Sequence, residues 1–234
     1  MTAPIGLEFL PNVGGEAEGL SDAGIETFRD RPFAAVARET GQNSRDAIDD
    51  HSRPVRMAFD IVSIPSSEFC SVDEYRTAAR LCLEKARASG NEKEIGFFTQ
   101  AVAALSSPRI QILRISDHNT RGVRGPCVEG QPFHTLAKAD GVSTKEDRNS
   151  GGSFGIGKNA AFALSDIQTA FFSTLYRDEG GTNRFLCMGK SLFISHTDGS
   201  GTQRRRKGYW GLRQEYMPIE DPSDAPEWAR RTEQ

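Results

Sequence analysis

One long polar stretch limits the folds that this chain can adopt. Residues 122–153 are rich in glycine, serine and charged side chains, whereas the flanking runs 109–116 and 156–164 are richer in apolar residues. Loops of this length are uncommon inside compact domains and are usually functional or disordered. We therefore predict a long functional loop between an apolar strand and a short helix.

Periodicity and turn residues predict the other elements. Helices are expected at about 33–50, 73–88, 92–105 and 156–164, the first opened by Pro32. Strands are expected at about 5–10, 55–64, 109–116, 168–177, 184–189 and 191–196. This order predicts an α+β fold with a mixed, mostly antiparallel sheet and helices on one face.

Composition narrows the class of protein. The chain has 234 residues, 37% of them hydrophobic, and a net charge of −3, which indicates a folded domain and gives no sign of membrane or nucleic-acid binding. A signal peptide and an apolar run long enough to cross a membrane are not expected. The cysteines form no C-x-x-C pair, so we expect reduced thiols in a cytoplasmic protein: Cys70, Cys82, Cys127 and Cys187.

One basic run stands out, at residues 204–207. We interpret it as the solvated tip of a hairpin. A contact with phosphate or nucleic acid is the alternative, so nucleic-acid binding stays open. The segment from Pro218 onward is rich in proline and charged residues and is expected to be a tail.

A polar stripe marks the first predicted helix. Glu39, Asn43, Asp46 and Ala47 have the spacing i, i+4, i+7 and i+8, which puts them on one helix face. A carboxylate can accept a proton from water, an amide oxygen can bind a hard cation, and the small Ala47 leaves room for a ligand. The alternative is a helix side that faces solvent.

An acidic residue closes the strand at 109–116. Asp117 can accept a hydrogen bond from an exocyclic amine, and Gly122 soon after it would let the backbone approach a flat ring. The alternative is an ordinary Asp-Asn turn.

The third pattern is a glycine-rich loop that enters a helix. Residues 152–158 offer free N–H groups to an anion, and Lys158 in the first helical turn opposes the helix dipole unless a phosphate lies there. The same stretch nearly matches a P-loop and a Rossmann fingerprint. The P-loop match fails at Asn159, and neither motif is preceded by a strand.

Together these patterns resemble the motifs of the GHKL superfamily, which includes gyrase B, the heat-shock ninety chaperone, histidine kinases and MutL. Its first motif, E-x-x-x-N-x-x-D-A, is matched in full by residues 39–47, and the chaperone-branch G-x-F-G-x-G by residues 152–157. In the second motif, D-x-G-x-G, Asn119 replaces a glycine and Gly122 falls one residue late. This form is similar to that of bacterial ATP-binding proteins, some linked to phage defence.

The resemblance covers about residues 5–196 and implies a Bergerat-type sandwich. Residues 1–217 would form the ATP-binding domain, with residues 122–153 as a lid over the nucleotide. Residues 218–234 would be a tail or the start of a missing transducer segment.

The resemblance also implies roles for single residues. Glu39 would activate the water that attacks the γ-phosphate, and Asn43 would ligate Mg²⁺. ATP would be held by Asn43, Asp46, Ala47, Asp117, Asn119, Gly122, Gly152, Phe154, Gly155, Ile156, Gly157 and Lys158. Catalysis of this kind is mostly positioning and charge neutralisation.

The expected function is therefore that of a slow, Mg²⁺-dependent ATPase that acts as a switch in a larger machine. ATP binding would order the lid and control homodimerisation, a partner subunit or a transducer domain. A nucleotide sensor or scaffold without hydrolysis is one alternative. A P-loop NTPase is the other.

Overall fold

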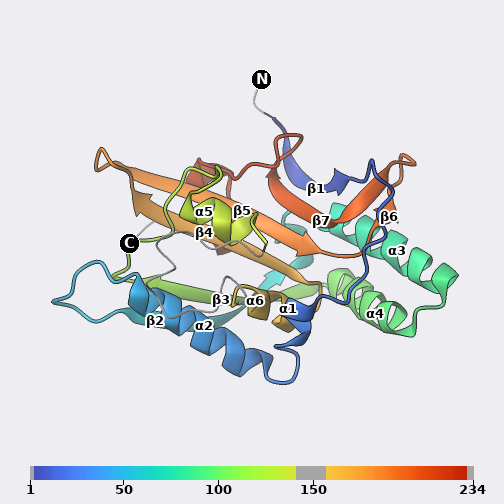
Figure 1. Cartoon of the computed structure of the whole chain (residues 1–234), viewed down its shortest axis with the longest axis horizontal. Helices are drawn as coiled ribbons and strands as arrows, with labels where there is room; N and C mark the ends of the chain where they lie inside the picture. The colour runs from blue at the N-terminus through green and yellow to red at the C-terminus, as the bar shows by residue number, and fades with distance from the viewer. Residues whose placement is uncertain (1–2, 141–156, 231–234) are drawn as a thin grey trace.

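The structure, a computed structural model, describes residues 3–140 and 157–230 (Figure 1). Its strands are β1 (Ile5–Pro11), β2 (Arg56–Pro65), β3 (Arg109–His118), β4 (Thr169–Arg177), β5 (Asn183–Leu192), β6 (His196–Thr197) and β7 (Gln203–Leu212). Its α-helices are α1 (Ala23–Glu26), α2 (Pro32–Asp46), α3 (Val72–Ser89), α4 (Glu92–Ser106), α5 (Pro132–Ala137) and α6 (Asn159–Leu164). Short 3₁₀ turns cover Ser66–Glu68, Pro222–Asp224 and Glu227–Ala229.

The α+β class and the antiparallel pairing are as expected, but the strands form two sheets rather than one mixed sheet. In the larger sheet the order is β1-β7-β5-β4, with β6 also paired to β7. The smaller sheet pairs β2 with β3. Within residues 3–140 and 157–230, no helix is long and apolar enough to cross a membrane.

Both faces of the larger sheet are covered, which corrects the expectation of helices on one face. Side chains alternate along β5, so Phe185 and Cys187 join one apolar cluster while Leu186 and Met188 join another. The first cluster packs against α3, α4 and the inner side of β2–β3. The opposite face meets α5 at one end and α1 and α6 at the other.

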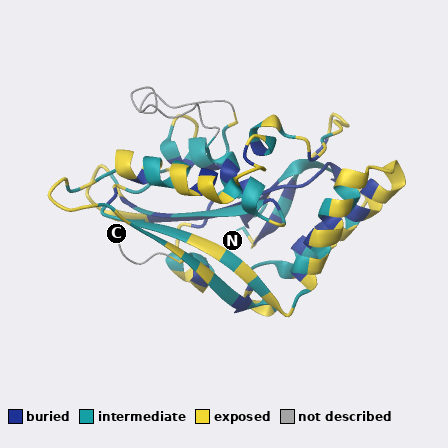
Figure 2. Cartoon of the chain, turned by 90° about the horizontal axis from the view of Figure 1, so that it is seen from below, coloured by how far each residue is buried: buried dark blue, intermediate teal, exposed yellow. Residues whose placement is uncertain are grey.

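The smaller sheet is buried along one side, and its other side is covered only in part, where Ile115 packs against α2 and α6. Val62 and Ile112 point toward the first cluster, whereas Ile61 on the outer side is 77% exposed. Figure 2 shows this contrast: buried and intermediate residues run along the larger sheet, and exposed residues lie on β2–β3 and the outer sides of helices. The four cysteines are free thiols, as expected.

Helices α2 and α5 and strand β5 are among the elements that differ from the sequence predictions. Helix α2 ends at Asp46 rather than near residue 50, because the next residues leave to bridge the turn after β3. Helix α5 lies inside the stretch predicted as a loop, and it begins at Pro132, which suits a first helical turn. Strand β5 is continuous to Leu192, where two strands were predicted.

The basic run is not a hairpin tip, so that prediction was wrong. It lies in β7, between β1 and β5. Arg205 contacts Glu18 at 3.1 Å and Arg206 contacts Asp22 at 3.1 Å. The acidic residues of the segment after β1 thus neutralise cations of a central strand, a pairing between distant residues that local composition does not reveal.

Residues 219–228 pack into the core. Ile219 exchanges backbone hydrogen bonds with Cys187 of β5. Trp228 stacks on Phe69 with ring centroids 5.6 Å apart, and its indole nitrogen donates to Glu68 O at 3.2 Å. Residues 219–228 therefore help to bury one face of the larger sheet.

We predict that Trp228→Ala lowers the free energy of unfolding by about 3–5 kcal/mol, because it leaves a cavity beside Phe69 and Phe171. Urea denaturation measures the change. Val13→Ala is the control, since Val13 is 95% exposed and its truncation should change stability by less than about 0.5 kcal/mol. Equal stability of the Trp228 variant and wild type would contradict the packing role.

Candidate functional site

The second half of α2 is joined to the end of β3. Ser44, buried on α2, donates its hydroxyl hydrogen to Asp117 Oδ2 at 2.9 Å. Arg121 N, just after β3, donates to Ala47 O at 2.8 Å. The helix with the polar stripe and the acidic strand end therefore meet, as the sequence predicts.

Asn119 stabilises this junction from a left-handed backbone conformation, with φ of 61°. Its side-chain nitrogen donates to Asp50 O at 2.9 Å and to Arg53 O at 2.8 Å, and its side-chain oxygen accepts from Asp50 N at 3.1 Å. The amide is thus directed at the 50–53 turn. Any nucleotide contact of Asn119 would have to come from its backbone.

Gly122 was expected to let the backbone approach a flat ring. In the structure it brings the chain close to β4. Its φ is +66°, and a Cβ built on it would overlap Leu175 O. The next residue, Val123, donates its N–H to Thr174 Oγ1 at 2.9 Å. A glycine is needed here because any side chain would push the chain away from β4.

Glu39 lies beside the start of the last motif. Its side chain is 14% exposed, and Arg38 contacts Glu39 Oε1 at 3.2 Å. A Cβ built on Gly157 would overlap the Glu39 carboxylate. The absence of a side chain at Gly157 therefore leaves space for Glu39 between α2 and the entry to α6.

The other members of the polar stripe are less sheltered. Asn43 and Asp46 are both exposed, as the alternative of a solvent-facing helix side also predicts. Arg45 contacts Asp46 Oδ1 at 3.5 Å. Ala47 caps the C-terminal end of α2. The stripe is thus half sheltered at Glu39 and open at Asn43 and Asp46.

Lys158 is buried rather than on the surface, with its side chain 8% exposed. Its ammonium group donates to Thr135 O at 3.0 Å and to Ala139 O, both at the end of α5. Burial, together with the nearby Lys190, lowers the pKa of Lys158 to about 8. The C-terminal carbonyls of α5 favour a cation, so they offset the unfavourable dipole of α6 without a bound phosphate.

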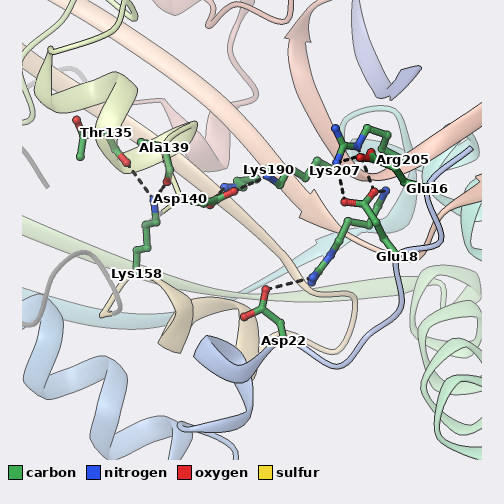
Figure 3. Close-up of polar contacts among 11 residues, drawn as sticks. Glu16, Glu18, Asp22, Thr135, Ala139, Asp140, Lys158, Lys190, Arg205 and Lys207 are labelled. Atoms are coloured by element: carbon green, nitrogen blue, oxygen red, sulfur yellow. Dashed lines mark hydrogen bonds and ion pairs between the residues drawn. The ribbon is translucent and has the colours of Figure 1, made fainter. Parts of the chain in front are cut away.

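Two further lysines join Lys158 (Figure 3): Lys190, which sequence reasoning missed, and Lys207, which was predicted only as part of the basic run. Asp140 accepts from Lys190 at 3.1 Å and lies 2.5 Å from the ammonium group of Lys207. Burial favours the neutral form of Asp140, but Lys190 and Lys207 outweigh it and hold its pKa at about 2. The available signal was a lysine inside the buried, apolar strand β5, since such a charge requires a partner.

Four predicted residues, Gly152, Phe154, Gly155 and Ile156, lie outside the described residues. In residues 3–140 and 157–230, no group of three or more His, Cys, Asp or Glu side chains is placed to hold a metal ion.

A cavity of about 1160 Å³ lies elsewhere, at the β4–β5 hairpin. Its lining includes Arg124, Tyr176, Arg184 and Glu220, but none of the described residues of the three motifs. Because the cavity lies away from the described residues of the three motifs, we place the candidate site at α2 and β3 instead.

No protein-family model, curated protein or solved structure matches the chain. The residues and their geometry therefore carry the functional proposal.

We predict that Asn119→Ala destabilises the protein by about 2–3 kcal/mol, because it removes hydrogen bonds to the 50–53 turn and strains a left-handed residue. Asn119→Gly should cost about 1 kcal/mol less, since glycine adopts this conformation freely. Chemical denaturation of the pair separates the two effects. An equal loss in both variants would show that backbone strain plays no part.

Proposed function

We propose that this chain is a cytoplasmic Mg²⁺- and ATP-binding domain of the GHKL type, with a Bergerat-type fold and slow ATP hydrolysis. The observation that carries the proposal is the meeting of motifs around α2. Glu39 abuts Gly157 and Ser44 binds Asp117, so a residue of the second motif and one of the third both contact the helix that carries the first.

Asp117 supports the base-binding end of this site. Its carboxylate is oriented by the Ser44 hydroxyl, and a carboxylate with two oxygens accepts several hydrogen bonds. It would therefore accept a hydrogen bond from the exocyclic amine of adenine while it keeps its hydrogen bond from Ser44 of α2. The junction at Ala47 and Arg121 fixes the distance between this carboxylate and the helix.

Asn43 and Glu39 support the phosphate end. One helical turn separates them, so both can face the same phosphate chain. Mg²⁺ in such sites is usually held by one or two protein oxygens together with phosphate oxygens, and the exposed amide of Asn43 fits that need. When bound, the ion would neutralise charge on the phosphates.

Glu39 is the proposed general base. Its side chain is sheltered, and Arg38 contacts one carboxylate oxygen at 3.2 Å. The space at Gly157 leaves the carboxylate next to the chain that leads into α6. From there Glu39 would orient a water and take its proton as the γ-phosphate is attacked.

The proposed role is a switch whose nucleotide state governs contact with a second copy, a partner subunit or a transducer domain, in a setting such as antiviral defence. The resemblance of the motifs supports this part. A sensor that binds ATP without hydrolysis has the same site and is distinguished by single-turnover hydrolysis.

We predict that Glu39→Gln keeps ATP affinity within about twofold and lowers turnover by roughly 10²–10⁴-fold, because it removes a general base without changing shape. Asp117→Asn should instead weaken ATP binding by about tenfold or more, since it disturbs the contact to the base. Calorimetric titration and phosphate release measure the two effects. Glu92→Gln at the exposed start of α4 is the control.

Other outcomes divide the alternatives. Wild-type turnover in Glu39→Gln would remove Glu39 from catalysis. Binding of Mg-ATP without single-turnover hydrolysis would favour the sensor. Nucleotide binding that Asn43→Ala leaves intact would favour a P-loop-like site around Lys158. No nucleotide binding by the wild-type protein would refute the proposal.

A further inference from the structure

Three ammonium groups converge on one carboxylate beside the candidate site (Figure 3). Asp140 lies 3.1 Å from Lys190, 2.5 Å from Lys207 and 4.0 Å from Lys158. Lys190 comes from β5 and Lys207 from β7. Lys158 precedes α6. The four residues, here called the lysine cluster, thus bring three elements and the end of the α5 segment to one point.

The lysine cluster has more positive than negative charge. Among the described residues, Asp140 is the only acidic side chain within ion-pair distance of these three ammonium groups. Lys190 is 1% exposed, so water does little to stabilise its charge. Burial of cations that are incompletely paired is costly. Electrostatics therefore favour a further anion at this place.

The Asp140 carboxylate does not contact the three ammonium groups equally. Two oxygens serve three ammonium groups, and Lys158 at 4.0 Å is beyond hydrogen-bond reach. A phosphate group has three terminal oxygens and a larger charge, so it matches three converging donors better. The chemistry of the donor set thus favours a phosphate-class oxyanion.

Asp140 is less enclosed than the lysines with which it pairs. It lies outside α5, which ends at Ala137, and its side chain is 47% exposed. The lysines are more firmly held: Lys190 is part of a buried strand, and Lys158 is bonded to two carbonyls of the α5 segment. Withdrawal of Asp140 would leave three donors in place.

Lys158 links the lysine cluster to the segment that abuts the proposed catalytic carboxylate. Lys158 directly follows Gly157, and Gly157 abuts Glu39. The chain that carries Lys158 therefore connects the lysine cluster with the phosphate end of the proposed site.

We propose that Lys158, Lys190 and Lys207 form a binding site for a phosphate-class oxyanion, and that Asp140 occupies this site as a built-in competitor when the anion is absent. The identity of the anion as the phosphate chain of a nucleotide rests on the proposed function. The site itself is a property of the lysine cluster. Phosphate oxygens would replace the oxygens of Asp140, which would turn to solvent.

The test is titration of the full chain with inorganic pyrophosphate by calorimetry at fixed ionic strength. Lys207→Met and Lys190→Met should weaken binding on the order of tenfold, because each removes a charged donor. Asp140→Asn should strengthen it several-fold, because it removes the competitor. Lys93→Met is the control, since Lys93 forms a surface ion pair with Glu26 and should leave binding unchanged.

The lysine variants and Asp140→Asn are expected to change pyrophosphate affinity in opposite directions, which makes the inference falsifiable. If Asp140 is only a structural partner, Asp140→Asn will weaken pyrophosphate binding or leave it unchanged, which overturns the proposal. Thermal unfolding checks folding: pyrophosphate should raise the melting temperature of Asp140→Asn more than that of wild type. Should Lys190→Met not fold, Lys207, which is 29% exposed, carries the test.

The two proposals can fail separately. If the wild type binds ATP, but Lys207→Met and Asp140→Asn leave pyrophosphate affinity unchanged, the lysine site is rejected and the nucleotide function is kept. If pyrophosphate binding depends on the lysine cluster but ATP does not bind, the lysine site is kept and the nucleotide function is rejected. Absence of pyrophosphate binding to wild type and to Asp140→Asn would reject the site.

Discussion

Burial of β5 on both faces is the constraint on which the other features depend. From Phe185 to Leu192 every residue of this strand is buried, so apolar elements must cover it from both sides. On one side these are α3, α4 and Trp228, and on the other α1, α5 and α6. A charged residue in such a strand needs a partner, and Lys190 finds Asp140. The burial of β5 thus determines where Lys190 and Asp140 form an ion pair.

The candidate site depends on a second constraint, the junction of α2 with the turn after β3. Backbone bonds at Ala47, Asn119 and Arg121, together with the Ser44 hydroxyl, hold a helix and a strand end in a fixed relation. Fixed geometry of this kind is what phosphoryl transfer needs, because catalysis there is largely positioning and charge neutralisation. On the same helix, Asn43 is exposed and Glu39 is sheltered.

Much of the fold could be predicted from local patterns. Strands β1, β2 and β3 and helices α3 and α4 carry clear periodicity, so their positions agree closely with the expected ranges. Strand β7 was missed because its charged half is neutralised by Glu18, Asp22 and Asp140, which are far away in sequence. Similarly, α5 is too short and polar for a periodic signal.

The candidate site also has features that the sequence predicts and features that it does not. The approach of α2 to Asp117 and of Glu39 to Gly157 was predicted from motif resemblance. The role of Asn119 in holding the 50–53 turn was not, because it depends on a left-handed backbone conformation. The lysine cluster was not predicted either, since it requires the register of two strands. Local sequence indicates residue types, whereas tertiary pairing decides which charges meet.

The pairing of β1 with β7 has a consequence for how the chain folds. Leu7 lies opposite Trp210, so the sheet joins residues near both ends of the sequence. Contacts of such wide separation slow folding, because the loop between them must be closed before they contribute. During synthesis, β1 therefore has no strand partner among the described strands until β7 has been made.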